Sequence, residues 1–493
     1  MRVASRTFDT TIRRHGVLAA DRNPFAHVSG ADGLALTEFQ ADLLDHPAPI
    51  RICSAPTGAG KTFAFEWAPA LGLNILFVVP TRRLAQNLEE NVRATMREDL
   101  GLDEGQIERR LSVWTSDAAA DKEVAGRNRQ QIRQERVAQL RGQGFETKGS
   151  FIIATPESIA WLLLCPPKPK HGQGGASIVD LLSRNHIVFD EFHTIEEQGF
   201  GLAASLCKIT SGLIEVEGFG NRPRITFLSA TPVEIAPVMK AFDIPETEIV
   251  HLEERVHDWE PGEDPEGARI VHGDVSVSMN HYTDIVEACR AESRQIADTL
   301  ASGRAVICVF DSLARIKTRQ GEISAIFQDH GVPASKIVTI NSIDDRHERG
   351  EDEYGIYGRK ADPSAARVIL ATSSIEMGVT FDASMMIMEP GFSDAAFLQR
   401  LGRVARRDVS GRVVVVQGNR AQLESSLLSG QAAHEKDGGD GLRVSVGDFT
   451  RWVLDRRIRA FQGIDMMSDR ITFATMADRA VWCAALFWVA MGQ

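Results

Sequence analysis

The sequence predicts an α/β fold with parallel sheets, divided into more than one domain. Apolar runs that end in small polar or turn residues recur in ILFVVPTRRLAQNLEE (75–90), FIIATPESIAWLL (151–163), ITFLSATP (225–232), AVICVFDSLARI (305–316) and VILATSSIEMGVTFD (368–382). This rhythm is typical of buried parallel strands whose loops meet at the carboxyl edge of a sheet, where ligands bind. A chain of 493 residues with 43% hydrophobic content also exceeds what one core usually serves, so two or more domains are expected.

Composition narrows the class of protein. The apolar stretch AVWCAALFWVAM (480–491) is too short for a membrane span, and the N-terminus has charges but no apolar core of a secretion signal. The six cysteines contain no C-x-x-C pair, which argues against a disulfide framework and against zinc. The net charge of −12 does not indicate binding of nucleic acid, although it describes the whole surface and not one groove. We expect a cytoplasmic protein without a membrane segment or zinc.

A phosphate-binding loop follows the first predicted strand. The stretch RICSAPTGAGKTFAFEWAPAL runs from a short apolar strand through a glycine-rich turn into a plausible helix. Glycines let backbone N–H groups approach phosphate oxygens, while Lys61 can reach the β and γ phosphates and Thr62 can bind Mg²⁺. The residues expected to line this loop are Thr57, Gly58, Ala59, Gly60, Lys61 and Thr62.

Two adjacent carboxylates end another predicted strand, in HIVFDEFHTIEE (186–197). Neighbouring acids near an apolar core resist ionisation unless a cation or a chemical task holds them there. Chemistry on the phosphates bound by the loop would be such a task. We predict that Asp190 holds Mg²⁺ and that Glu191 orients or deprotonates the water that attacks the γ-phosphate.

With these sites, the chain resembles the superfamily 2 DExD/H-box helicases over roughly residues 35–420. The motifs occur in the order of that family: Ala55 to Thr62 (I), Pro80 to Arg82 (Ia), Thr155 to Glu157 (Ib), Asp190 to His193 (II), Ser229 to Thr231 (III), Thr372 to Gly378 (V) and Gln399 to Arg406 (VI). The resemblance implies two tandem RecA-like parallel-sheet domains. We place the first at 35–241 and the second at 269–420, with an N-terminal extension at 1–34, an acidic linker at 242–268 and a helical C-terminal region at 421–493.

The resemblance also implies how ATP is used. Gln40 would read adenine, although a solvent-facing helix glutamine is an equal alternative for it, and Gly378 would contribute to the ATP site. Arg403 and Arg406 of the second domain would stabilise charge on the transferred phosphoryl group. Polar links between the ATP site and the strand-binding face would be His193, Ser229, Thr231 and Gln399.

Single-stranded nucleic acid is expected to contact loops of both domains. The residues suited to its phosphates are Thr81, Arg82, Thr155, Thr372 and Ser373, whose hydroxyl and guanidinium groups do not read sequence. The basic run KEVAGRNRQQIRQERVAQLR (122–141) is either a second contact or a solvated face.

Details of the motifs look most like the helicase subunits of type I CRISPR systems, particularly the type I-D branch. These details are DEFH, SATP, HGDVSVSMNH (272–281), TSSIEMGVTFD and QRLGRVARR. The segment before the phosphate loop is too short for the HD nuclease that precedes many relatives, so cleavage would belong to another subunit of the effector complex. An RNA or DNA-repair helicase with the same motor, and an ATP-gated clamp that does not unwind, remain alternatives.

The C-terminal region has helical spacing with aromatic residues on apolar faces, in FTRWVLDRRIRAF and MADRAVWCAALFWVAM. Trp452, Trp482, Phe487 and Trp488 either form the core of a small helical bundle or dock a partner. Aromatic stripes are more often core, so we favour the bundle.

Overall fold

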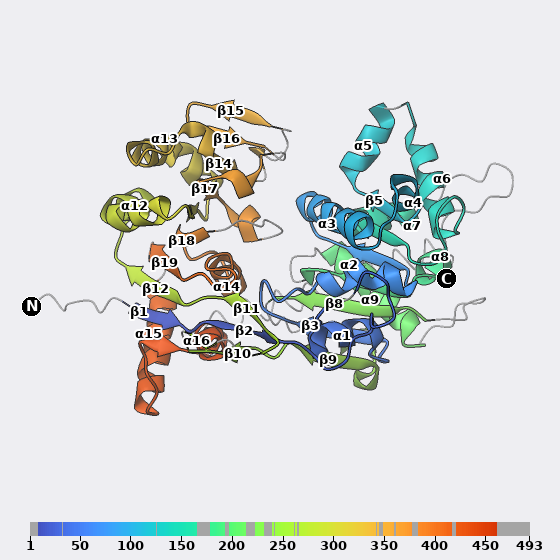
Figure 1. Ribbon diagram of the computed structural model, residues 1–493, viewed down its shortest axis with the longest axis horizontal. Coiled ribbons are helices and arrows are strands. Elements are labelled where there is room, and N and C mark those ends of the chain that lie inside the picture. The colour runs from blue at the N-terminus through green and yellow to red at the C-terminus, as the bar shows by residue number, and fades with distance from the viewer. Residues whose placement is uncertain are drawn as a thin grey trace, which may run out of the picture. The chain divides into compact units, whose positions relative to one another are not determined.

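The computed structural model describes residues 8–31, 33–124, 126–164, 178–192, 197–212, 222–230, 239–240, 242–260, 262–263, 266–341, 343–344, 349–358, 361–376, 383–416 and 421–460. They form two compact units. We call Ala19–Pro56 with Gly60–Arg255 the first lobe. The second lobe holds the described residues before Ala19, Thr57–Ala59 at the tip of the phosphate loop, and the described residues from Val256 onward. Each lobe is a sheet covered by helices (Figure 1).

The first lobe is built on a parallel sheet. Among its described residues, strands pair in the order β5-β6-β4-β7-β8-β3-β9. Their bounds are β3 (Ile50–Ser54), β4 (Ile75–Val78), β5 (Leu111–Trp114), β6 (Phe151–Ala154), β7 (His186–Phe189), β8 (Arg224–Ser229) and β9 (Ile249–Glu253). Strands β4, β6 and β7 are buried along their whole length, as expected for a parallel sheet covered on both faces. Their carboxyl ends meet at one edge.

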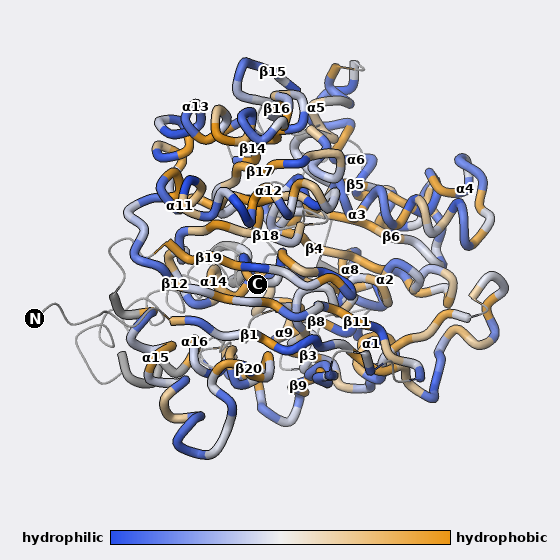
Figure 2. Tube along the Cα trace, turned by 60° about the vertical axis from the view of Figure 1, so that its left-hand side comes forward, coloured by the Kyte–Doolittle hydropathy of each residue, from blue (hydrophilic) through white to orange (hydrophobic). Residues whose placement is uncertain are grey.

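Helices of the first lobe alternate with its strands. Their bounds are α1 (Glu38–Asp45), α2 (Phe63–Trp67), α3 (Arg82–Ala94), α4 (Glu104–Glu108), α5 (Ser116–Val124), α6 (Arg129–Leu140), α7 (Pro156–Leu164), α8 (Ile178–Leu182) and α9 (Glu197–Thr210), with short turns Ala68–Leu71, Thr95–Asp99 and Glu246–Glu248. In α3, Ala85, Leu88 and Val92 are buried at helical spacing. The apolar residues of β4 and β6 are coloured orange in Figure 2.

The second lobe has a larger, mostly parallel sheet. Among its described residues, strands pair in the order β15-β16-β14-β17-β13-β18-β19-β12-β1-β20. Their bounds are β1 (Phe8–Ile12), β12 (Val275–Asn280), β13 (Ala305–Val309), β14 (Ile337–Ile340), β15 (Gly350–Asp352), β16 (Gly355–Tyr357), β17 (Val368–Ala371), β18 (Ala383–Met388), β19 (Gly411–Val416) and β20 (Arg443–Val444). The five apolar runs of the sequence are therefore strands, and the predicted α/β fold with two parallel-sheet domains is confirmed.

The N-terminal strands belong to the second lobe, whereas the sequence placed residues 1–34 in a separate extension. Strand β1 pairs antiparallel with β12 and parallel with β20. Strand β2 (His15–Leu18) forms a three-stranded sheet with β10 (His257–Asp258) and β11 (Ala268–His272). Short strands whose partners lie hundreds of residues away leave little local signal. For the same reason, the sequence indicated only a linker at 242–268. This segment contains strand β9 of the first-lobe sheet as well as β10.

Helices cover both faces of the second-lobe sheet. Their bounds are α11 (Ile285–Ala291), α12 (Ser293–Ala301), α13 (Leu313–Asp329), α14 (Asp394–Leu401), α15 (Ala421–Lys436) and α16 (Val446–Ala460), with short turns Ala334–Lys336, Pro363–Ala365 and Ser373–Glu376. Alternate strand residues pack against α11 to α13 on one face and against α14 to α16 on the other. Among all described helices, none is long and apolar enough to cross a bilayer.

The helical C-terminal region packs onto the second lobe as far as it is described. Leu427, Phe449, Trp452 and Val453 are buried in the core beside β1. Trp452 is therefore a core residue. Trp482, Phe487 and Trp488 lie outside the described residues.

Candidate active site

The phosphate loop leaves the carboxyl end of β3. Gly58 and Gly60 have φ values of +88° and +80°, a left-handed conformation that favours glycine, and this lets the loop turn tightly. Lys61 is buried, and its Nζ donates a hydrogen bond to the Ala55 carbonyl oxygen over 3.1 Å. Thr62 stands at the N-cap of α2. The loop thus has the conformation and the side chains expected of a phosphate cradle.

Gln40 braces this loop. Its side chain is buried, its Nε2 donates to the Gly60 carbonyl over 2.9 Å, and its Oε1 accepts from the Thr37 N–H over 3.0 Å. Thr37 is the N-cap of α1, and its hydroxyl donates to the Glu254 carboxylate over 2.6 Å. The structure therefore gives Gln40 a positioning contact with the loop, while its adenine contact stays a prediction.

The acid pair follows β7. The N–H of Asp190 donates to the Val78 carbonyl over 2.9 Å, and the Asp190 side chain is only 4% exposed. Glu191 adopts φ +46°, which is uncommon for a residue other than glycine, and its N–H donates to Asp190 Oδ1 over 3.0 Å. The next residue, Phe192, is buried edge-on against Phe227. Backbone strain of this kind is retained only where the surrounding packing holds it, and it is common at functional sites.

The sheet order brings the phosphate loop and the acid pair to neighbouring positions. Strand β8 alone separates β3 from β7, and Ser229 ends β8. Ser229 is buried, and its carbonyl accepts from the Ala55 N–H over 3.1 Å. Ser229 therefore lies between the two halves of the first-lobe site, while its linking role stays a prediction.

Loops at the same sheet edge carry the nucleic-acid candidates of the first lobe. Thr81 is the N-cap of α3, where its hydroxyl accepts from the Leu84 N–H over 3.2 Å, and Arg82 is exposed. Thr155 follows β6, the neighbour of β4, and its hydroxyl donates to Ser158 Oγ over 3.2 Å. These residues share one edge, although both threonine hydroxyls already serve the starts of helices.

The basic run between these loops is largely paired within the protein. Arg133 and Arg136 are buried, and both guanidinium groups lie over the Trp161 ring. Glu135 accepts from Lys122 over 2.6 Å and from Arg127 over 2.5 Å. The run therefore builds the α5–α6 hairpin, which argues against its use as a strand contact.

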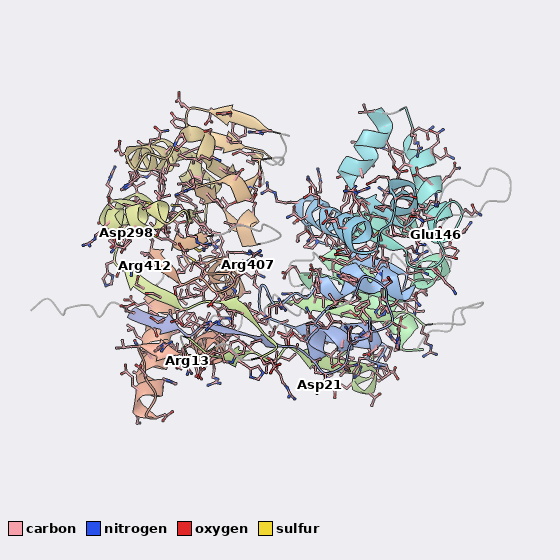
Figure 3. All side chains as sticks on the ribbon, viewed as in Figure 1. Arg13, Asp21, Glu146, Asp298, Arg407 and Arg412 are labelled. Atoms are coloured by element: carbon pink, nitrogen blue, oxygen red, sulfur yellow. The ribbon has the colours of Figure 1, made fainter. Side chains whose placement is uncertain are left out.

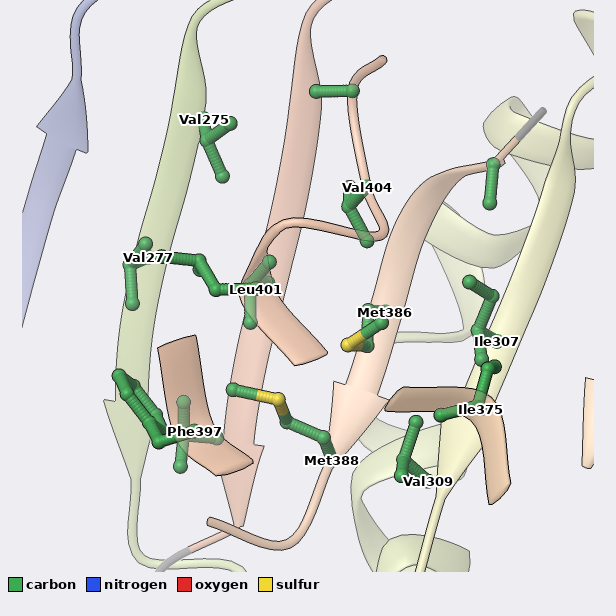
Figure 4. Packing of buried hydrophobic residues seen from close by; sticks show 14 of the residues in the cluster. Val275, Val277, Ile307, Val309, Ile375, Met386, Met388, Phe397, Leu401 and Val404 are labelled. Carbon is green, nitrogen blue, oxygen red and sulfur yellow. The ribbon is translucent and has the colours of Figure 1, made fainter. Parts of the chain in front are cut away.

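In the second lobe, Thr372 and Ser373 follow β17. Thr372 is 9% exposed, and its N–H donates to the Ile340 carbonyl over 3.2 Å. Ser373 is exposed and starts a short helical turn anchored by buried Ile375 (Figure 4). A hydroxyl group is thus presented at the carboxyl edge of this sheet as well.

Helix α14 leads into the predicted arginine pair. Gln399 and Arg403 are buried, and α14 is held by Phe397 and Leu401 in the core (Figure 4). Beyond it, Arg406 forms an antiparallel bridge with His272. The flanking Ala405 and Arg407 have φ values of +59° and +63°, so the chain turns sharply there. Figure 3 labels Arg407 at the end of this segment.

The arginine pair has unfavourable electrostatics in isolation. Burial, followed by the nearby charges of Arg403 and Arg407, lowers the pKa of Arg406 to about 9. Arg406 remains protonated at neutral pH, so the charges of Arg403 and Arg407 repel it. An anion such as a phosphoryl group would relieve this repulsion.

An ionic network that the sequence did not reveal supports α14. Arg400 is fully buried, and its Nη1 donates to Asp311 Oδ1 over 2.6 Å and to the Glu389 carbonyl over 2.7 Å. The Glu389 carboxylate accepts from the Asp311 N–H over 2.6 Å and from Arg315. Asp311 and Glu389 each stand just after a strand, β13 or β18, which is the position that also identified Asp190.

His193, Thr231 and Gly378 lie outside the described residues. For Mg²⁺, the Asp190 carboxylate and the Thr62 hydroxyl are the hard oxygen donors that this ion prefers, so the residues present fit it. Within the part of the chain that the structure describes, no group of three or more His, Cys, Asp or Glu residues could hold a metal ion.

Comparisons with known proteins agree with this geometry. Residues 50–237 match the family model described as DEAD/DEAH box helicase. A solved structure of the DUF1998 helicase MrfA bound to DNA aligns with a TM-score of 0.58 and 14% identity, over 91% of this chain and 60% of that one. T. fusca Cas3 aligns with a TM-score of 0.53 and 15% identity, over 90% of this chain and 54% of that one. The chain thus spans little more than half the length of these proteins, and no curated protein sequence matches it.

Proposed function

We propose that the chain is a DNA helicase or translocase of a type I CRISPR interference system. Residues 50–237 match the DEAD/DEAH box helicase family, and the chain has the fold of superfamily 2 helicases, which use ATP. It would hydrolyse ATP to move along and unwind single-stranded or R-loop DNA. Cleavage would come from a separate HD nuclease subunit of the effector complex.

One observation carries the ATPase part of this proposal: the phosphate loop and the acid pair end strands that are separated only by β8. The loop would bind the β and γ phosphates, with Lys61 as the cation beside them. Asp190 and Thr62 would hold Mg²⁺, which when bound neutralises charge on the phosphates. Glu191, which is held in a turn with φ +46°, would take the proton of the attacking water once that water lies within hydrogen-bond reach of its carboxylate.

The arginines of the second lobe would complete the reaction. An anion beside Arg403 and Arg406 would stabilise both guanidinium groups, since Arg406 is buried and Arg403 lies near enough to repel it. We propose that both lobes act on one nucleotide and that a bound strand promotes this arrangement. Thr81, Arg82 and Thr155 would contact the strand on the first lobe, and Thr372 and Ser373 on the second.

The CRISPR assignment is supported by the fold shared with T. fusca Cas3 and by the motif variants DEFH and QRLGRVARR. A second candidate is a DNA helicase outside CRISPR. It is favoured by the alignment with MrfA, whose structure contains DNA and whose TM-score is similar.

The test is ATP hydrolysis by the purified chain with single-stranded DNA or RNA of equal length at one salt concentration. We expect low activity alone and strong stimulation by DNA that falls as salt rises, because phosphate contacts release counterions. Lys61→Ala is the control for contaminating ATPases. Stimulation by RNA that equals or exceeds that by DNA would contradict the DNA motor, and no stimulation by either strand would favour an ATP-gated clamp.

A further inference from the structure

An exposed aromatic ring marks the second lobe. Phe392 lies in the loop between β18 and α14, and 73% of it is exposed. The other large exposed apolar side chains of the described residues include Leu442, at 66%, in the turn between α15 and α16. A single exposed apolar residue needs no explanation by itself. Phe392 differs because of how its loop is held and where it stands.

Hydrogen bonds on both sides of Phe392 fix the loop that carries it. The N–H of Gly391 donates to Asp311 Oδ1 over 2.9 Å, and the same oxygen accepts from buried Arg400. Gly391 has φ +82°, and a side chain there would meet Ala396 and Arg400 at 3.1 and 3.4 Å. On the other side, Ser393 caps α14 by accepting from the Ala396 N–H over 3.1 Å. The ring is therefore exposed on a fixed backbone.

The loop stands at the sheet edge that is expected to bind a strand. Strand β13 pairs with both β17 and β18, and backbone bonds extend this pairing from Phe310 to Ala371 and from Glu389 to Val309. The loops after β17 and β18 thus flank the loop after β13. They carry Ser373 and Phe392, and the first turn of α13 adds the Arg315 guanidinium, whose side chain is 59% exposed.

We propose that Phe392 is a base-stacking residue, on which one nucleobase of a bound single strand packs while the hydroxyl groups of Thr372 and Ser373 contact its phosphates. Aromatic rings beside backbone-binding groups are the usual construction of sequence-independent single-strand sites. This assignment rests on the proposed function, and it adds a contact to the bases, whereas the other candidate residues address only the backbone.

The position also connects the strand to the arginine pair. Phe392 directly precedes Ser393, the N-cap of α14, and the eight residues of this helix span about 12 Å. Its far end leads to Arg403 and Arg406. A base held by Phe392 would therefore fix the start of the helix whose end carries the predicted catalytic arginines.

The experiment compares strand binding by wild type and Phe392→Ala, measured by fluorescence anisotropy with dT and U oligomers and with a strand of the same length that has abasic sites. We expect Phe392→Ala to weaken binding of the normal strands by about fivefold to 150-fold, the range for one base–aromatic stack. Binding of the fully abasic strand should be the same for both proteins. Phe392→Trp should restore the affinity, because it retains a stacking ring.

Leu442→Ala is the matched control, since it removes an exposed apolar side chain of the same lobe and should leave binding unchanged. Unchanged binding by Phe392→Ala would overturn the proposal. An equal loss on normal and abasic strands would overturn it too, because the ring would then not touch a base. If wild type binds neither DNA nor RNA, the proposed function itself fails.

Discussion

The two lobes hold their functional residues by different physical means. In the first lobe, strand ends and tight turns place Lys61, Asp190 and Glu191, and the described hydrogen bonds at these residues each involve a backbone group. In the second lobe, α14 is fixed by buried charges, chiefly the pair of Arg400 and Asp311. The functional residues of the first lobe thus depend on backbone geometry, and those of the second lobe depend on buried ion pairs. Substitutions in the first should change chemistry, and substitutions in the second should alter stability as well.

The largest effect is expected from the second lobe. Arg403→Ala should lower the strand-stimulated ATPase rate by about 10³-fold or more, because an arginine that stabilises the transferred phosphoryl group contributes that much. Strand affinity should stay near that of wild type, since the residue is assigned to the phosphate. Stopped-flow phosphate release and anisotropy measure the two quantities.

Arg290→Ala is the control, since Arg290 is an exposed arginine of the same lobe that pairs with Glu322. If Arg403→Ala keeps the stimulated rate, the second lobe supplies no catalytic charge at this position. The proposed difference between the two lobes would then fail.

A somewhat smaller effect is expected in the first lobe. Glu191→Gln should lower kcat by roughly 10²- to 10⁴-fold with ATP binding nearly intact, because the carboxylate acts on water and the amide cannot accept its proton. Lys61→Ala should instead weaken ATP binding and turnover together. Binding of a fluorescent ATP analogue separates the two variants, with exposed Glu246→Gln as the control. Wild-type turnover by Glu191→Gln would remove the assignment.

The same contrast explains what the sequence could predict. The first-lobe site follows from local patterns, since GAGKT and DEFH lie within a few residues of predicted strands, and these strands were found. The ionic network of the second lobe joins Asp311 to Glu389 and Arg400, which lie 78 and 89 residues further along the chain, so no local pattern identifies the pairing. Strand β1 is a similar case, because its partners β12 and β20 are more than 260 residues away. The sequence could not show either long-range arrangement.

A stability measurement sharpens the comparison. Asp311→Asn should destabilise the second lobe by about 3–5 kcal/mol, because it leaves the buried Arg400 guanidinium without its charge partner. Urea unfolding followed by hydrogen exchange would assign the loss to β13, β18 and α14. Asp298→Asn, at an exposed position of α12, is the control and should change little. A loss below about 1 kcal/mol would show that the ion pair of Arg400 with Asp311 adds little to the stability of the second lobe.

The smallest effect concerns Glu66, a buried carboxyl group of the first lobe whose described side-chain partner is an amide of α3. Glu66 of α2 is 7% exposed, accepts from Asn91 Nδ2 over 3.4 Å, and burial raises its pKa to about 7 from 4.5. The folded protein therefore retains this proton where the unfolded chain has lost it. The resulting stabilisation is present below pH 4.5 and disappears as pH rises through about 7, with an upper bound of roughly 3 kcal/mol.

Glu66→Gln isolates this contribution, because glutamine stays neutral and every other titrating group is common to both proteins. The difference in unfolding free energy, Glu66→Gln minus wild type, should rise between pH 5 and pH 8, when a buried anion destabilises only wild type. A difference that is flat with pH would show that the Glu66 carboxyl is ionised throughout. The first lobe would then tolerate a buried anion beside its phosphate loop with only an amide contact, and the distinction from the arginine-paired carboxylates of the second lobe would fail.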